Sequence, residues 1–188
     1  MAAVVTRHRL TVSDFYKMAE VGILTDEDRV ELIEGELIEM SPMGPLHAGV
    51  GDLLEEILRS ALGQVATVRS QKPLRLDDKS ELEPDIVVVE RSNDHYRKAH
   101  PIPANVYLVI EVSDTSLHKD REVKIPLYAQ HSTPEVWLVN LVEACLEVYR
   151  HPQPAECRYT QITRHSKGIV APERFPTVNV DVAGLFHV

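Results

Sequence analysis

The order of apolar and polar residues along the chain predicts several buried strands. Residues 83–89 and 106–112 are rich in β-branched side chains, which is typical of strands covered on both faces. Asp85 lies near the start of the first segment and Glu111 near the end of the second, where a sheet meets solvent. Shorter strands are expected at residues 65–69, 71–76, 135–140 and 178–182.

Two further regions have the pattern of β-hairpins. Residues 30–40 form two similar halves on either side of Gly35, which supplies the positive φ that a tight turn needs. The acids of this hairpin are expected to lie on solvated faces, although one of them could approach a metal site: Glu31, Glu34, Glu36 and Glu39. Residues 145–150 and 157–163 are expected to pair as a second hairpin across a proline-containing turn.

Apolar residues spaced by three and four positions predict helices at residues 10–18 and 47–62. A third helix is expected at residues 120–130, where Asp120, Lys124 and Tyr128 are spaced by four after a segment with the composition of a helix start. Thr11 or Ser13 can cap the first helix, because a hydroxyl there accepts a hydrogen bond from a free backbone N–H. Pro126 interrupts the third helix, and it is expected to kink the helix or to mark the start of a new turn. The order of elements predicts a mixed α/β fold with a central sheet, covered on at least one face by helices.

Length and composition are those of an ordinary globular protein. The chain has 188 residues, of which 44% are hydrophobic, and this favours a single domain spanning residues 1–188. No apolar run approaches the roughly 20 residues of a membrane helix. Residues 1–7 lack the pattern of a signal peptide, so a cytoplasmic location is expected.

The charge balance bears on the choice of partners. A net charge of −9 counts against a broad nucleic-acid surface, which is usually basic, but it leaves room for a local basic patch. Cys145 and Cys157 are not arranged as a zinc motif. They could face each other across the second hairpin, although a cytoplasmic location favours two reduced thiols.

Candidate chemistry lies at the ends of the two buried strands. Asp85 precedes the first apolar run and Glu111 lies near the end of the second. Carboxylates on neighbouring strands repel each other unless a cation lies between them, and hard divalent cations prefer such oxygen ligands. Lys124 would add a fixed positive charge. The residues therefore indicate metal-assisted hydrolysis of a phosphodiester.

Four other residues are candidates for supporting roles, and each has a structural alternative. Glu34 is a candidate second acid or a solvated turn residue. His47, at the start of a predicted helix, could contact substrate or metal, or serve as a cap or surface residue. Asp120 and Tyr128 are spaced by four from Lys124 and share its helix face, although such a tyrosine commonly packs in a core.

Together these motifs resemble the Uma-two family of putative restriction endonucleases, formerly a domain of unknown function, in the PD-(D/E)xK nuclease superfamily. The resemblance covers about residues 10–149. It is carried by the Pro-Asp before the first valine run, by Glu111, by the lysine-bearing helix and by the strand at residues 135–140. The hairpin at residues 30–40 and His47 also match the family.

The resemblance implies a restriction-endonuclease-like core, with a four-stranded mixed sheet between helices. Asp85, Glu111 and the backbone carbonyl of Val112 would hold Mg²⁺, with Mn²⁺ as a substitute, and DNA would be the substrate. Ser113 stands where the superfamily pattern has lysine, so Lys124 would serve as the relocated lysine. Superfamily nucleases often dimerise, which implies a homo-oligomer, a dimer or larger, in which the apolar C-terminal strands could take part.

Two alternatives to a DNA endonuclease remain open at this point. The acidic charge and the serine at position 113 also fit a binding or scaffold protein that keeps the nuclease fold without catalysis. A metal-dependent hydrolase of small phosphoesters would use the same acids. Retained Mg²⁺ binding separates an enzyme from a scaffold, and the substrate separates the two enzymes.

Overall fold

A six-stranded mixed sheet forms the centre of the computed structural model, which describes residues 6–25 and 27–187. The strand order is β10-β9-β8-β7-β6-β3, and only the β7–β8 pair is parallel among these neighbours. The strands are β3 (Ala66–Ser70), β6 (Ile86–Glu90), β7 (Val106–Ser113), β8 (Glu135–Asn140), β9 (Cys145–Gln153) and β10 (Arg158–His165). The mixed α/β prediction is confirmed, and the sheet exceeds the four strands implied by the resemblance because the β9–β10 hairpin extends one edge.

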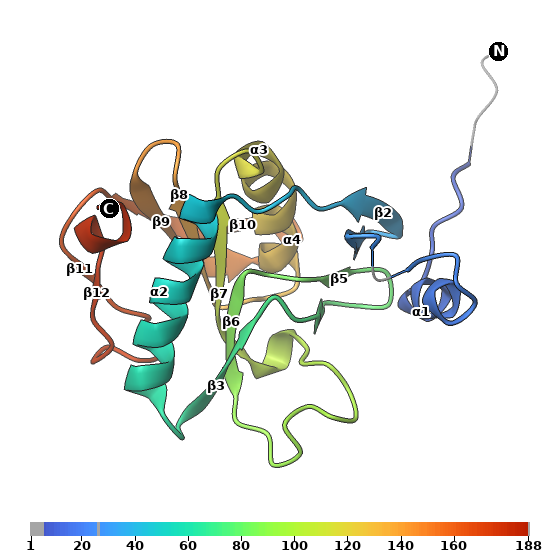
Figure 1. Cartoon of the computed structure of the whole chain (residues 1–188), viewed down its shortest axis with the longest axis horizontal. Coiled ribbons are helices and arrows are strands. Elements are labelled where there is room, and N and C mark those ends of the chain that lie inside the picture. Colours follow the sequence, from blue (N-terminus) through green and yellow to red (C-terminus); the bar gives the residue numbers. More distant parts are fainter. Residues whose placement is uncertain (1–5, 26, 188) are drawn as a thin grey trace.

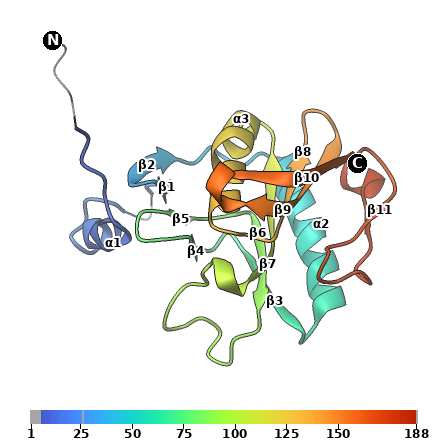
Figure 2. The same ribbon diagram turned by 180° about the vertical axis from the view of Figure 1, so that it is seen from behind.

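Helices cover both faces of this sheet (Figures 1 and 2). The helix α2 (Pro45–Leu62) packs on one face together with the C-terminal strands β11 (Ile169–Val170) and β12 (Val180–Asp181). The opposite face carries α4 (Ile125–Gln130). Alternate residues of β6 and β7 point to the two cores, which explains why both strands have almost no polar interruption: Ile86, Val88, Leu108 and Ile110 face α2, and Val87, Val89 and Val109 face α4.

The helical segment before α4 is continuous with it. A short helix, α3 (Leu117–Lys119), leads into a π-helical turn at Asp120–Lys124, in which the Ile125 N–H donates to the Asp120 carbonyl. Pro126 stands at the first turn of α4, where its missing N–H is tolerated. The interruption of the helix that was expected at Pro126 is therefore a π-helical turn that ends just before the proline.

A second sheet, in the order β2-β1-β5-β4, lies beside the central one (Figure 1). It comprises β1 (Val30–Ile33), β2 (Glu36–Glu39), β4 (Leu74–Arg75) and β5 (Glu81–Leu82), and α1 (Val12–Glu20) precedes it. The predicted hairpin turns at Gly35, whose φ is +79°, and a Cβ there would lie 2.7 Å from the Cβ of Arg9. Glycine is therefore required at this turn both for its conformation and for the close approach of the preceding chain.

Local sequence signals bear on the start of the first helix and on the two cysteines. Thr11, rather than Ser13, caps α1 and forms a capping box with Asp14. Both cysteines are free, as the favoured expectation of two reduced thiols has it: Cys145 is buried in β9 and Cys157 is exposed in the turn before β10, so the two do not face each other across the hairpin.

Two observations concern the predictions on targeting. In the part of the chain that the structure describes, no helix is long and apolar enough to cross a membrane. Residues 1–5, on which the prediction of no signal peptide mainly depends, lie outside the described residues.

Candidate active site

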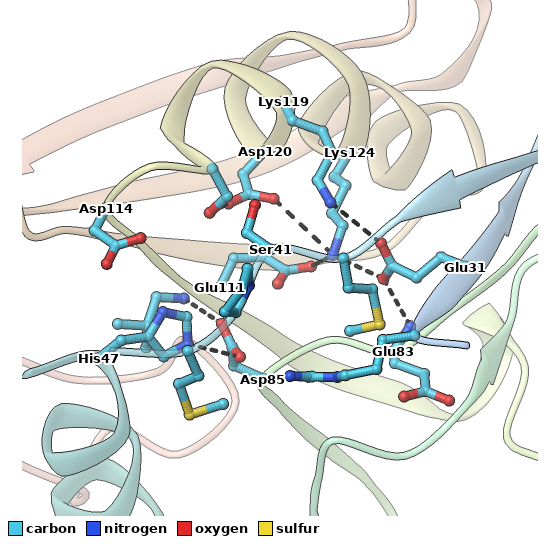
Figure 3. Close-up of a pocket in the computed structure, with 16 residues that line it drawn as sticks. Glu31, Ser41, His47, Glu83, Asp85, Glu111, Asp114, Lys119, Asp120 and Lys124 are labelled. Carbon is cyan, nitrogen blue, oxygen red and sulfur yellow. Dashed lines mark hydrogen bonds and ion pairs between the residues drawn. The ribbon is translucent and has the colours of Figure 1, made fainter. Parts of the chain in front are cut away.

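Strand pairing brings the two predicted acids together. The strands β6 and β7 are antiparallel and pair Ile86 with Ile110, so continuing the register by one residue sets Asp85 opposite Glu111. Glu111 is one position away from side chains that face α2 and therefore points toward the α3–α4 side, while Asp85, just before β6, lies within reach of His47 from α2. Figure 3 shows the two carboxylates in one cavity with His47, Glu31, Asp120 and Lys124.

Asp85 is held by donors from two elements. Its Oδ2 accepts a hydrogen bond of 2.7 Å from the backbone N–H of Val112, and its Oδ1 lies 2.9 Å from Nε2 of His47. His47 is the third residue of α2 and its side chain is 13% exposed, so it is neither a cap nor a surface residue. Burial lowers the pKa of His47, but the hydrogen bond and negative charge of Asp85 outweigh burial and raise it overall.

Lys124 reaches Glu111 from the helix, as the relocated lysine of the resemblance would. Its Nζ lies 3.2 Å from Glu111 Oε1 and 2.8 Å from Glu31 Oε1. Lys124 is 4% exposed, and a lysine is almost never buried to this degree unless its charge is paired. Burial alone would lower its pKa, but the carboxylates of Glu111, Glu31 and Asp120 raise it, so the amine stays protonated.

Glu31 lies in the site, although the sequence pattern did not single it out from the four acids of the hairpin, of which one was a candidate to approach the metal. It was expected on a solvated hairpin face, but it is 1% exposed, and its Oε1 also accepts a hydrogen bond of 2.9 Å from the N–H of Glu83. Its Oε2 is buried without a hydrogen bond among the described residues and lies 3.7 Å from Nζ of Lys119. One signal was available, because Glu31 shares a strand face with the apolar Ile33 two positions later.

Asp120 and Tyr128 support the site in different ways. Asp120 Oδ2 accepts hydrogen bonds of 2.6 Å from the hydroxyls of Ser113 and Ser116, and Oδ1 lies 3.9 Å from Lys124 Nζ. Tyr128 donates to Glu111 Oε1 at 2.6 Å and is fully buried. Tyr128 thus orients the acid rather than the lysine.

Glu34 is not brought to the site. It occupies the exposed hairpin turn with a φ of +49°, and it is absent from the lining of the cavity. Of the predicted residues, the structure gathers Asp85, Glu111, Lys124, His47, Asp120 and Tyr128, and it adds Glu31.

Negative charge exceeds positive charge in this buried cluster. The pKa of Glu111 is raised to about 8: burial is the largest cause, Lys124 opposes the rise, and Asp120, Asp85 and Glu31 add to it. Such an accumulation of carboxylates is stabilised by a cation, and oxygen ligands suit a hard one.

The residues fit a magnesium ion in part. No three His, Cys, Asp or Glu side chains within residues 6–25 and 27–187 already surround one point as metal ligands. Magnesium, however, is commonly held by one or two carboxylates and completes its shell with water and substrate phosphates. Asp85 and Glu111 provide two carboxylates, and the hydrogen bonds that Glu111 accepts from Lys124 and Tyr128 both go to Oε1. The cavity between them has a volume of about 50 Å³, which admits an ion with water but not a nucleotide.

Comparisons with known proteins identify the family and the fold of the chain. The crystal structure of a protein from Anabaena variabilis, described as a "putative nuclease belonging to DUF820", is similar to this chain with a TM-score of 0.76 and 20% sequence identity. The similarity covers 94% of this chain and 97% of the other, and at this identity it shows a shared fold. No curated protein sequence matches. A family model described as "Putative restriction endonuclease" matches residues 12–183, so the chain belongs to the Uma2 family.

Proposed function

We propose that the protein is a Mg²⁺-dependent endonuclease that hydrolyses phosphodiester bonds of DNA. The observation that carries the proposal is the buried cluster in which Asp85 and Glu111 lie on adjacent strands and Lys124 contacts Glu111 at 3.2 Å. Membership of a restriction endonuclease family and the nuclease-like fold support it. Mn²⁺ is expected to substitute for Mg²⁺.

Each candidate site residue has a definite task in this proposal. Asp85 and Glu111, with the Val112 carbonyl, would hold the ion, which when bound supplies a Lewis acid beside the phosphate and lowers the pKa of nearby water. Lys124 keeps a protonated amine next to Glu111, where it stabilises negative charge that develops on the phosphate oxygens.

The remaining contacts hold these groups in place before substrate arrives. Tyr128 fixes one oxygen of Glu111, and His47 together with the Val112 N–H fixes both oxygens of Asp85. Glu31 holds Lys124 from the side opposite Glu111. A preorganised site of this kind needs little rearrangement during the reaction.

The test is cleavage of supercoiled and linear DNA with Mg²⁺, Mn²⁺ or EDTA. Wild type is expected to cleave only with metal, and Glu111→Gln and Lys124→Met are expected to lose at least about a hundredfold in rate, as removal of one electrostatic contact typically does. Glu34→Gln is the matched control, because that acid is exposed in the turn and outside the cavity. Cleavage that survives Glu111→Gln would refute the assignment.

A small-phosphoester hydrolase is the second candidate, favoured by the net charge of −9 and the small cavity. Hydrolysis of bis(p-nitrophenyl) phosphate that depends on Glu111, without cleavage of any DNA, would select it. Absence of Mg²⁺ binding together with absence of both activities would leave a scaffold with the nuclease fold.

A further inference from the structure

A second cavity adjoins the candidate active site on the side of α1. Its volume is about 660 Å³, within the range of roughly 300–1,000 Å³ that is usual for small-molecule sites. The two cavities share four lining residues: Arg29, Met40, Met43 and Glu83. A group bound in the larger cavity would therefore lie directly beside whatever occupies the smaller one.

The lining of this second cavity combines apolar and polar side chains. Its large apolar side chains are Phe15 of α1, Leu24 of the following loop, Met40 and Met43. The Phe15 ring is itself held edge-to-face against Tyr16, at 5.9 Å between centroids. Aromatic and methionine side chains are common partners of stacked rings, because they offer a large polarisable surface.

The polar groups at its edge are mainly acceptors. Asp28 and Glu83 carry carboxylates and Gln71 an amide, and burial together with the nearby Glu31 raises the pKa of Glu83. Carboxylates disfavour a phosphate, but they accept hydrogen bonds from the amino and ring N–H groups of a nucleobase. Arg29 is the one arginine or lysine that lines both cavities, so it is placed at the boundary to contact a phosphate.

The overall charge favours a strand that offers few phosphates to the protein. A duplex lies across a broad surface and is usually met by many lysines and arginines. This chain carries a net charge of −9, and the cations that line the catalytic cavity are Arg29, Lys119 and Lys124, with His47 paired to Asp85. Single-stranded substrates instead gain affinity from bases stacked on aromatic side chains.

We propose that the cavity formed by Phe15, Leu24, Met40 and Met43 binds an unpaired base next to the scissile phosphate, so that the preferred substrate is single-stranded or locally unpaired DNA. The position of this base beside a phosphate that is cleaved rests on the proposed nuclease function, while the base-binding site itself rests on the geometry of the second cavity. It makes the neighbouring base, rather than the duplex groove, the feature that the protein recognises.

The test is the affinity for a short fluorescent oligodeoxynucleotide, measured by anisotropy with Ca²⁺ in place of Mg²⁺. The comparisons are the same strand paired to its complement and a strand of abasic residues that keeps every phosphate. Loss of one stacked base is expected to weaken binding roughly 5- to 150-fold. Both the duplex and the abasic strand are expected to fall in that range relative to the single strand.

Two variants locate the effect in the cavity. Leu24→Trp fills the cavity from a loop, and Ile23→Trp adds the same ring to the adjacent residue, which is 64% exposed and outside the cavity. Leu24→Trp is expected to weaken single-strand binding at least about fivefold, and Ile23→Trp to leave it unchanged. Phe15→Ala gives a third measurement, with a melting curve to confirm that α1 remains folded.

The outcomes separate this inference from the proposed function. Equal affinity for the abasic strand, or equal effects of Leu24→Trp and Ile23→Trp, would overturn the base-binding site even if DNA is cleaved. If no DNA is cleaved but base-dependent binding is lost in Leu24→Trp, the nuclease proposal fails and the base-binding site stands.

Discussion

The buried lysine of the candidate site makes the strongest prediction about stability. In Lys124→Met, a methionine side chain of similar length fills the space of the lysine, but the ammonium group is lost. In the wild type its Nζ lies between Glu31 and Glu111, at 2.8 Å and 3.2 Å from their Oε1 atoms. The acids are 1% and 2% exposed, so water cannot replace the lost charge. The variant keeps two buried carboxylates with the cation that offsets them removed.

The expected size of the effect follows from this burial. Removing one partner of a buried ion pair costs about 3–5 kcal/mol, mainly because the other charge is left uncompensated. For a chain of this length the melting temperature should fall by roughly 6–20 °C. Most folded proteins have about 5–15 kcal/mol of stability, so the variant is expected to fold at room temperature.

Urea unfolding of a double-mutant cycle with Glu31→Gln measures the coupling. Glu31→Gln in the Lys124→Met background removes one of the two unpaired charges, so it should recover a part of the loss, whereas alone it should destabilise. Lys119→Met is the matched control, because Lys119 is more exposed and lies 3.7 Å from Glu31; its loss should cost less than about 1 kcal/mol.

The pH dependence provides a second check. The folded-state pKa of Glu111, about 8, exceeds the unfolded value of about 4.3, so the folded state binds the extra proton and stability falls as pH rises between these values. Loss of Lys124 raises that pKa further, so the penalty of Lys124→Met should grow with pH. A penalty below about 1 kcal/mol near pH 8, or one independent of pH, would refute the buried cluster.

Three further predictions concern single contacts. Tyr128→Phe removes the hydrogen bond to Glu111, so it should lower stability by about 1.5–3 kcal/mol in urea unfolding and slow DNA cleavage. The pKa of Glu147 is lowered: burial opposes this, but hydrogen bonds from Tyr149 and Arg121 outweigh burial. The stabilisation from ionised Glu147 is therefore present above about pH 4.3 and is lost as the pH falls further. In Arg121→Gln the free energy of unfolding, measured in urea, should depend less steeply on pH in this acid range. Gly35→Ala should lower stability by more than about 1 kcal/mol, because φ is +79° and the new Cβ would clash with Arg9; an unchanged melting temperature would contradict the turn geometry.

Hydrophobic pattern was sufficient for the strands that carry the two acids. The runs of valine and isoleucine in β6 and β7 leave few polar positions, so an acid at the end of each was conspicuous. Consecutive strands are often neighbours, and this made the meeting of Asp85 and Glu111 predictable. The helix of Lys124 was predicted from periodicity, and its choice as the relocated lysine came from the family resemblance.

The hydrophobic pattern could not show which elements outside the central sheet contribute side chains to the site. Glu31 comes from the second sheet and His47 from a helix on the opposite face, and both meet their partners only through tertiary packing. A glutamate in a short hairpin is usually solvated, so its sequence context favoured the wrong environment for Glu31. Periodicity describes how one element is buried and leaves open what lies against it.

The position of Lys124 shows how the pattern within one element and the packing between elements act together. Ser113 lies two residues after Glu111 and therefore on the same strand face, but it is fully buried and its hydroxyl is engaged by Asp120. Lys124 instead reaches Glu111 across the interface from a π-helical turn, a distortion that is frequent at functional sites. A long lysine arriving from a helix has several rotatable bonds, and a single carboxylate would fix it loosely. Glu31 supplies the second contact on the other side, so Lys124 and Glu31 form one unit: in the proposed mechanism the lysine supplies the charge, and the glutamate fixes its position.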